Sequence, residues 1–227
     1  MNSSVITFPG SNCDRDMDVA LKKFGFKNKM VWHGDVELPK SDLVVLPGGF
    51  SYGDYLRCGS MASKSKIMKS VISFAKTGGK ILGICNGFQI LVESGLLPGV
   101  LLRNKYLDFI CKNVFVKIND KNSLYFKDIK KNTLELHIAH NEGSYFCSKE
   151  QIQEIEDNNQ AALFYSDENG NVNEKNNPNG SIKNIAGIFN KEKNILGMMP
   201  HPERMIDSSL SGEDGSIFFE NLINNLK

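Results

Sequence analysis

Hydrophobic residues in the first half of the chain fall into short runs, each followed by a loop rich in glycine or polar residues. The runs are four residues long and occupy positions 5–8, 43–46 and 81–84. Short apolar runs with β-branched residues, bounded by turn residues, are typical of buried parallel strands. We therefore predict three such strands, with a loop at the carboxyl end of each.

Between these runs, apolar residues recur at the spacing of a helix surface. Residues 67–75 place five apolar side chains on one face, and two glycines follow at 78 and 79. Similar stripes lie at 16–24, 88–92 and 216–226. Alternating strands and helices predict an α/β fold with an open, doubly wound, mostly parallel sheet of the flavodoxin-like type. In such sheets ligands bind at the carboxyl ends of the strands, where the three loops lie.

The second half of the chain is richer in strand patterns. Residues 134–138 alternate between apolar and polar positions, which predicts a half-buried strand. Further short strand patterns occupy 114–118, 161–165, 184–189 and 194–199. The asparagine-rich stretch 169–180 is expected to be an exposed loop. Since no repeat or linker divides the chain, residues 1–227 are expected to form a single domain.

Charge and cysteine content narrow the function classes. Lysine and arginine total 27 against 26 aspartate and glutamate, and a net charge of +1 gives no long-range attraction to nucleic acid. No apolar run approaches the roughly 18 residues that span a bilayer, and no secretory pattern is present, so a cytoplasmic protein is expected. The five cysteines include no C-x-x-C pair, which favours free thiols over a disulfide framework or a zinc site. We expect no bound metal.

One cysteine lies in a turn typical of an enzyme nucleophile. Residues 83–87 are Gly-Ile-Cys-Asn-Gly, the cysteine form of the G-x-S-x-G elbow that exposes a nucleophile between a strand and a helix. The helix N-terminus favours the thiolate of Cys85, and the N–H of Asn86 is placed to stabilise an oxyanion. Gln89 shares the face of Cys85 and is a candidate for binding substrate. A free cysteine is also often a small buried apolar residue, so the turn alone leaves both interpretations open.

A cysteine nucleophile requires a base, usually one of the histidines. His201 precedes Pro202, which favours an extended backbone, and residues i and i+2 of an extended segment face the same side. Glu203 would then orient the imidazole and stabilise its cation, so His201 and Glu203 are the predicted base and orienting carboxylate. His140 is the second candidate, pointing inward at the end of a predicted strand. The other two histidines, His33 and His137, are expected at the surface or in strand packing.

The glycine-rich loop at 47–50 follows the second predicted strand. Glycines allow backbone N–H groups to approach a substrate, and one oxyanion donor contributes roughly 10²–10³ in rate. Gly49 and Phe50 are therefore candidate oxyanion or substrate-binding residues. Taken alone, the loop is equally typical of an ordinary turn.

Taken together, these residues resemble a known enzyme family. The turn at 83–89 with His201-Pro202-Glu203 is similar to the class I (triad-type) glutamine amidotransferases. Longer motifs at 9–14, 47–59, 96–99, 177–181 and 196–204 resemble the branch of glutaminase subunits of phosphoribosylformylglycinamidine synthases. The family often has glycine where Asn141 stands after His140, and asparagine tolerates a left-handed backbone better than most residues. The resemblance does not indicate what the loop at 9–14 does.

The resemblance implies roles for residues and partners. Cys85 would be the nucleophile, His201 the base and Glu203 the orienter, with an oxyanion hole around Gly49 and Asn86 and with Gln89 holding glutamine. Glutamine would be hydrolysed to glutamate, and the ammonia would pass to a large synthetase subunit that makes formylglycinamidine ribonucleotide from formylglycinamide ribonucleotide in purine biosynthesis. A small accessory subunit would complete the complex. This chain has no G-x-x-x-x-G-K-[ST] loop, so no cofactor is expected on it, and ATP and Mg²⁺ are expected on the partner.

Two other classes of protein share part of the pattern. A cysteine peptidase or hydrolase would have the same nucleophile turn, but it would not require Gln89 together with the His-Pro-Glu unit. A redox-sensing module would use Cys85 only as an oxidisable thiol, and it would not depend on His201 or Glu203.

Overall fold

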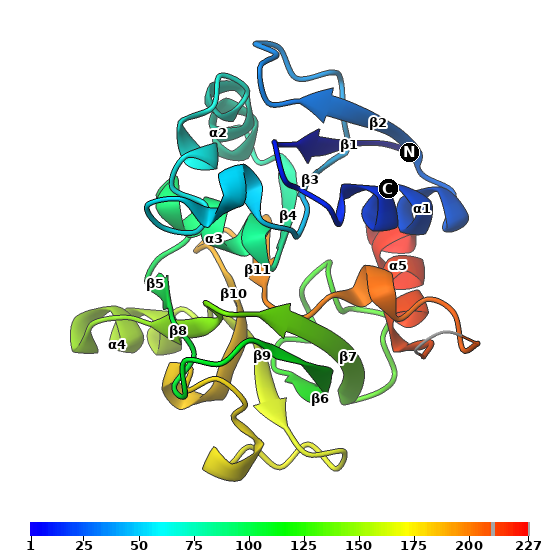
Figure 1. Cartoon of the computed structure of the whole chain (residues 1–227). Helices are drawn as coiled ribbons and strands as arrows, with labels where there is room; N and C mark the ends of the chain where they lie inside the picture. Colours follow the sequence, from blue (N-terminus) through cyan, green and yellow to red (C-terminus); the bar gives the residue numbers. More distant parts are fainter. Residues whose placement is uncertain (210–211, 227) are drawn as a thin grey trace.

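A computed structural model describes residues 1–209 and 212–226 of the chain. Its main sheet has nine strands in the order β2-β1-β3-β4-β11-β10-β9-β6-β7, and β5 and β8 form a separate two-stranded ribbon (Figure 1). The strands are β1 (Asn2–Thr7), β2 (Lys27–Trp32), β3 (Leu43–Leu46), β4 (Lys80–Ile84), β5 (Val100–Leu102), β6 (Ile110–Ile118), β7 (Thr133–His140), β8 (Ser144–Phe146), β9 (Ala161–Ser166), β10 (Ile185–Phe189) and β11 (Ile195–Met198). The α-helices are α1 (Asp14–Lys23), α2 (Met68–Lys76), α3 (Asn86–Glu93), α4 (Lys149–Asp157) and α5 (Asp214–Asn225).

One half of the main sheet is parallel. β2, β1, β3, β4 and β11 pair in parallel in that order, which is the strand order of a flavodoxin-like sheet. Helices α1 and α5 lie on one side of this half, and α2 and α3 lie on the other (Figure 1). The predicted doubly wound α/β fold is therefore confirmed.

The other half of the sheet is antiparallel. β10, β9, β6 and β7 follow β11, each antiparallel to its neighbour. The edge strand β7 returns toward the parallel half, because His137 forms an isolated antiparallel bridge with His201, just after β11. This contact brings the end of β11 against β7, which lies four places away in the sheet order.

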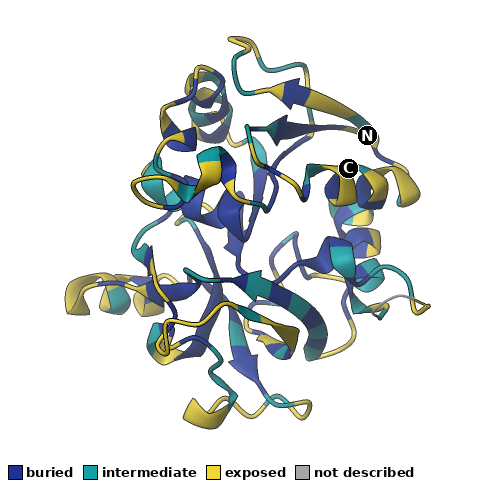
Figure 2. Cartoon of the chain, viewed as in Figure 1, coloured by how far each residue is buried: buried dark blue, intermediate teal, exposed yellow. Residues whose placement is uncertain are grey.

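Burial follows the predicted hydrophobic pattern. Every residue of β3 is buried, and β7 alternates between buried and half-buried positions, as the sequence pattern predicted. Figure 2 shows the buried strands at the centre of the molecule, with exposed residues along α4 and the outer loops. Within the described residues, no helix is both long enough and apolar enough to cross a membrane.

Several features differ from the sequence-based expectations, and the ribbon of β5 and β8 is among the elements that were not predicted. β2 and α4 were not predicted, because β2 is an edge strand with mostly exposed side chains and α4 buries only Ile155. The start of α4 is stabilised by a capping box between Ser148 and Gln151. The stretch 169–180 is exposed over most of its length, but Asn179 is fully buried, so the expectation of an exposed loop is wrong at that residue.

Candidate active site

Cys85 lies in a strained turn between β4 and α3. Its backbone has φ 49° and ψ −104°, which is costly for a residue with a β-carbon and is typical of a nucleophile elbow. Gly87 permits the turn, because a β-carbon there would lie 1.9 Å from the carbonyl oxygen of Leu46. The neighbouring strand β3 therefore packs directly against the first turn of α3. Glycine at the last position of the G-x-C-x-G pattern avoids this collision.

Parallel pairing brings Cys85 and His201 to the same edge of the sheet. β4 and β11 are neighbours with Ile84 opposite Met198, and the Cys85 N–H donates to the Met198 carbonyl oxygen at 2.8 Å. Cys85 directly follows β4, and His201 lies three residues beyond the end of β11. The His201 N–H is held by the His137 carbonyl oxygen at 2.7 Å. The Cys85 thiol also faces β7, the strand of His137, because its Sγ lies 3.7 Å from the carbonyl oxygen of Ala139 in that strand.

His201 and Glu203 form a buried pair. The His201 Nδ1 lies 2.6 Å from the Glu203 Oε1, and the two side chains are 1% and 0% exposed. Their backbone geometry differs in part from the prediction. His201 is extended, with φ −102° and ψ 91°, but Pro202–Arg204 forms a 3-10 turn. Glu203 therefore reaches the imidazole by turning back, and not by the side-by-side projection of an extended segment.

The charges around His201 favour its protonated form. Burial by itself lowers the pKa of His201, but the Glu203 carboxylate and Cys85 outweigh burial and raise that pKa to about 10. Its Nε2 is buried and makes no hydrogen bond of good geometry within the described part of the chain. Because Nδ1 bonds to Glu203, Nε2 is the ring nitrogen left for proton transfer.

The first turn of α3 is fixed by a chain of side-chain amides. The Asn86 Oδ1 accepts from the Ser51 N–H at 3.2 Å, and its Nδ2 donates to the Gln89 Oε1 at 2.9 Å. The Gln89 Nε2 in turn donates to the Glu142 carbonyl oxygen at 2.6 Å. Gln89 therefore ties α3 to the loop after β7.

The glycine-rich loop after β3 packs against the loop at 9–14. The Phe50 N–H donates to the Gly10 carbonyl oxygen at 2.9 Å, so in this structure that N–H is engaged and is not directed at a substrate. A β-carbon on Gly49 would lie 2.7 Å from the Asn12 backbone nitrogen. The Phe50 side chain is 42% exposed, and its ring lies 6.4 Å from that of Phe109.

His140 is buried, as predicted, and it is neutral. Burial, followed by the neighbouring charge of His201, lowers the pKa of His140 to about 4. Asn104 donates through Nδ2 to the carbonyl oxygens of Asp108 and His140, so its Oδ1, 3.1 Å from the His140 Nδ1, must be an acceptor. The His140 proton therefore resides on Nδ1. The opposite nitrogen, Nε2, is buried without a hydrogen-bond partner among the described residues.

Several supporting residues were not predicted from the sequence. Asn104 holds His140, and Asn179 donates through Nδ2 to the Gly143 carbonyl oxygen at 2.8 Å and to the Tyr165 hydroxyl at 3.1 Å. Asn179 belongs to the motif at 177–181 that carries the family resemblance, which was the available signal. For Asn104 we find no sequence signal.

A cluster of possible metal ligands lies behind the site. The Sγ of Cys13, a ring nitrogen of His201 and a carboxylate oxygen of Glu203 all lie within 4.8 Å of one another, a grouping that the cysteine spacing did not predict. The Arg204 guanidinium lies 3.0 Å from the same sulfur. This cation opposes the entry of a second positive charge.

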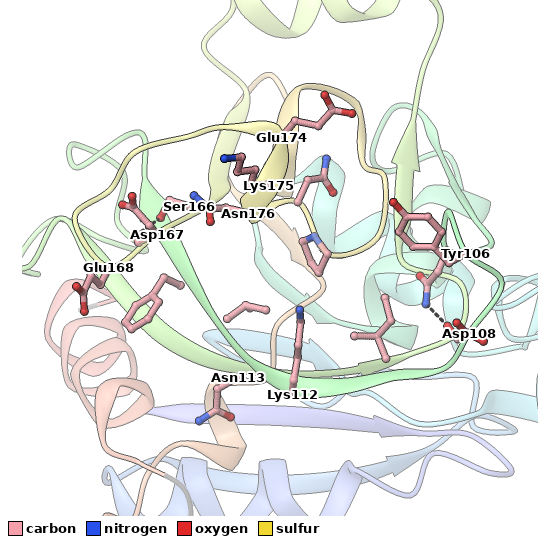
Figure 3. Close-up of a pocket in the computed structure, with 16 residues that line it drawn as sticks. Tyr106, Asp108, Lys112, Asn113, Ser166, Asp167, Glu168, Glu174, Lys175 and Asn176 are labelled. Carbon is pink, nitrogen blue, oxygen red and sulfur yellow. Dashed lines mark hydrogen bonds between the residues drawn. The ribbon is translucent and has the colours of Figure 1, made fainter.

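A cavity of about 770 Å³ lies between β6 and the loop after β9 (Figure 3), and Asn104, which holds His140, is one of its lining residues. The strand residues Lys112 and Asn113 line it, and Glu174, Lys175 and Asn176 lie across it on the loop after β9. None of the predicted site residues lines this cavity.

Comparison with known proteins identifies the family. The family model of the CobB/CobQ-like glutamine amidotransferase domain matches residues 1–212. This chain belongs to that glutamine amidotransferase family. The amidotransferase is 85% identical to the phosphoribosylformylglycinamidine synthase subunit PurQ of Pelagibacter ubique (strain HTCC1062), over the full length of both chains. It is 49% identical to the same-named subunit of Zymomonas mobilis, with 98% of each chain covered.

Solved structures agree with this assignment. The structure of PurLQS from Thermotoga maritima includes a chain that matches all of this amidotransferase and is itself covered to 99%, with a TM-score of 0.87 and 38% identity. A glutamine amidotransferase from the same organism matches with a TM-score of 0.65 at 16% identity, which supports the fold alone. The family resemblance inferred from residues 83–89 and the His-Pro-Glu unit is therefore confirmed.

Proposed function

We propose that this amidotransferase is a cytoplasmic glutaminase subunit that hydrolyses glutamine at Cys85 and supplies the ammonia to phosphoribosylformylglycinamidine synthase. The observation that carries the proposal is the buried His201–Glu203 pair, whose imidazole interacts with the side chain of Cys85 on a strained elbow. This arrangement occurs in a chain that is 85% identical, end to end, to a subunit of that name.

The chemistry follows from the protonation of His201. Because the pKa of His201 is raised to about 10, the imidazolium is the favoured form at neutral pH beside a Cys85 thiolate. The thiolate attacks the side-chain carbonyl carbon of glutamine and forms a tetrahedral oxyanion. As the C–N bond breaks, His201 gives its proton to the leaving nitrogen and ammonia departs. Neutral His201 then activates water, which splits the thioester into glutamate and the free thiol.

The oxyanion requires donors, and Asn86 and Gly49 are the proposed pair. Asn86 is the first residue of α3, and the first N–H groups of a helix have no acceptor within it. Gly49 lies on the loop after the neighbouring strand. Phe50 then acts at the rim through its half-exposed ring. Gln89 and His140 complete the proposed glutamine pocket, with the His140 Nε2 as an acceptor for a substrate N–H.

The ammonia acceptor is proposed to lie on partner subunits. The relative from Pelagibacter ubique is named as one subunit of a synthase, and the Thermotoga maritima structure is named PurLQS. A large synthetase subunit would bind ATP and Mg²⁺ and use the ammonia to convert formylglycinamide ribonucleotide to formylglycinamidine ribonucleotide. A small accessory subunit would join them. Exposed apolar side chains support a docking face, because Tyr55 and Leu56 are 74% and 91% exposed on the loop beyond Phe50.

Reconstitution with the synthetase subunits tests the proposal. Cys85→Ala should abolish amidine synthesis from glutamine and leave synthesis from added ammonia intact, because only the ammonia source is removed. Cys147→Ala, which removes another buried cysteine, is the matched control and should retain both activities. If Cys85→Ala removes both activities in a folded complex, the proposed division of labour is wrong.

A second experiment separates a glutaminase from a general cysteine hydrolase. A chloroketone analogue of glutamine should alkylate Cys85, and excess glutamine should protect the thiol. The modified residue is identified by mass spectrometry of the Cys85 peptide. Alkylation that glutamine does not slow would favour the hydrolase.

A further inference from the structure

The loop at 9–14 contains a cysteine, Cys13, that lies behind the proposed catalytic pair. Cys13 directly precedes α1 and is 2% exposed. The Arg204 Nη2 donates to its Sγ at 3.0 Å, and the same sulfur lies within 4.8 Å of ligand atoms of both His201 and Glu203. The Cys13 thiol therefore contacts the Arg204 guanidinium, and the same thiol lies close to the Glu203 carboxylate.

The packing around this thiol leaves little room for movement. A β-carbon added to Gly48 would lie 2.6 Å from the His201 Cε1 and 3.4 Å from the Cys13 Sγ. The His201 imidazole and the Cys13 thiol therefore pack against the same side of the glycine-rich loop, at Gly48. Removing the sulfur would open a space next to the ring.

The charges of this cluster are also arranged around Glu203. Burial, followed by the Glu203 charge, raises the pKa of Cys13 to about 12, so the thiol is neutral and accepts the Arg204 hydrogen bond. Arg204 also lies 3.8 Å from the Asp16 carboxylate, and the Glu203 charge acts on its guanidinium. The Glu203 Oε2 is buried and has no hydrogen-bond partner within the described residues. Among those residues, therefore, only the Oε1 of Glu203 is held by a direct hydrogen bond, from the His201 Nδ1.

We propose that Cys13 is a positioning residue for the glutaminase reaction. It holds the Arg204 guanidinium beside Glu203, and it fills the space behind the carboxylate, so that Glu203 stays turned toward His201. Cys13 does not touch the substrate and acts through Glu203. This inference rests on the proposed function, and it gives the loop at 9–14 a role in the site.

The expected effect of removing the thiol has a definite sign. The titratable groups around the cluster are Cys85 after β4, Asp14 and Asp16 of α1, His137 of β7, and His201, Glu203 and Arg204 after β11. If Glu203 turns away from His201, the imidazolium loses the charge that contributes most to raising its pKa, so the pKa of His201 should fall. A misplaced Glu203 should also slow the reaction, by roughly 10-fold to 100-fold.

The test compares Cys13→Ala, Cys13→Ser and Cys147→Ala with the wild-type full-length chain. The rate of Cys85 alkylation by the chloroketone analogue is measured from pH 6 to 11, and the Cys85 peptide is quantified by mass spectrometry. Cys13→Ala should be alkylated at least roughly 10-fold more slowly, and its upper pH transition should move down by about half a pH unit or more. Serine keeps an acceptor for Arg204, so Cys13→Ser should restore both the rate and the wild-type profile.

The outcomes separate this inference from the proposed function. If wild-type Cys85 is not alkylated in a glutamine-protectable way, the glutaminase proposal fails. If the wild type is alkylated and folded Cys13→Ala matches it in rate and profile, the role of Cys13 is refuted. A loss of rate in Cys13→Ala with an unchanged pH profile, or a loss shared equally by Cys147→Ala, indicates general destabilisation and also overturns the positioning role.

Discussion

Replacing Glu203 with glutamine isolates the charge of the orienting residue from its shape. Glutamine has nearly the same volume, and its side-chain oxygen can still accept from the His201 Nδ1 in the place of the Glu203 Oε1, now at 2.6 Å. The pair is buried, so water cannot replace the lost charge. Glu203→Gln therefore keeps the imidazole in position and weakens only the stabilisation of its cation.

The size of the effect follows from the environment of His201. A rise of the His201 pKa from 6.5 to about 10 corresponds to roughly 5 kcal/mol in favour of the imidazolium. Glu203 is the first of the favourable causes, ahead of Cys85, and losing a hydrogen bond between two charged groups costs roughly 2–3 kcal/mol. Since roughly 1.4 kcal/mol is a factor of ten in rate, Glu203→Gln should slow glutamine hydrolysis roughly 30- to 150-fold.

The assay is the pH dependence of kcat/KM for glutamine in the reconstituted complex. Glu203→Gln should lower the rate and move the alkaline limb to lower pH, because the imidazolium loses its protons more easily. Glu220→Gln, which neutralises an exposed carboxylate on α5, should leave both unchanged. A change of less than about threefold with an unmoved alkaline limb would refute the assignment of Glu203 as the stabilising carboxylate.

Three further predictions concern the surroundings of the pair. Gly48→Ala places a β-carbon 2.6 Å from the His201 Cε1 and should lower kcat at least roughly 100-fold, whereas Gly78→Ala, with nothing within 4 Å, should affect stability but not kcat. Asn179→Ala removes the Nδ2 bonds to Gly143 and Tyr165 and should raise KM for glutamine and lower the free energy of unfolding by roughly 1–3 kcal/mol in urea titrations. His140 has a folded-state pKa of about 4, below its ordinary 6.5, so its contribution to stability is present above pH 6.5 and is lost as the pH falls toward 4. His140→Gln should therefore reduce the acid-induced loss of unfolding free energy over that interval by up to roughly 3 kcal/mol, and an equal loss in both proteins would contradict a neutral buried His140.

The parallel half of the fold and the nucleophile turn could be predicted from the sequence because their signals are local. A short buried strand has a recognisable run of residues, and the elbow at Cys85 has glycines where neighbouring backbone leaves no room for a β-carbon. The pairing of Cys85 with His201 was predicted from residue types and from the spacing of the His-Pro-Glu unit, without the order of the strands. The register of Ile84 opposite Met198 makes β4 and β11 neighbours.

The remaining features depend on contacts that no local pattern records. The two-residue spacing of His201 and Glu203 was informative, but the backbone that joins them is a 3-10 turn, because Pro202 begins a helical turn as readily as it continues an extended segment. The bridge between His137 and His201 joins strands that are distant in the sheet order. The role of Cys13 depends on the placement of Arg204, which follows from the tertiary fold and not from the sequence of the loop at 9–14.

The loops around the site are joined largely by asparagine side chains, and there is a physical reason for this choice. An asparagine amide donates two hydrogen bonds and accepts two, so it can connect several backbone segments without adding a charge. Asn104 and Asn179 each make four such bonds, to the segments around 108, 140–143, 165 and 181. Aspartate in the same places would lose the donors and add a buried negative charge near Cys85. That charge would oppose the thiolate of the proposed mechanism, so the neutral amide is the side chain that stiffens the pocket without weakening the proposed nucleophile.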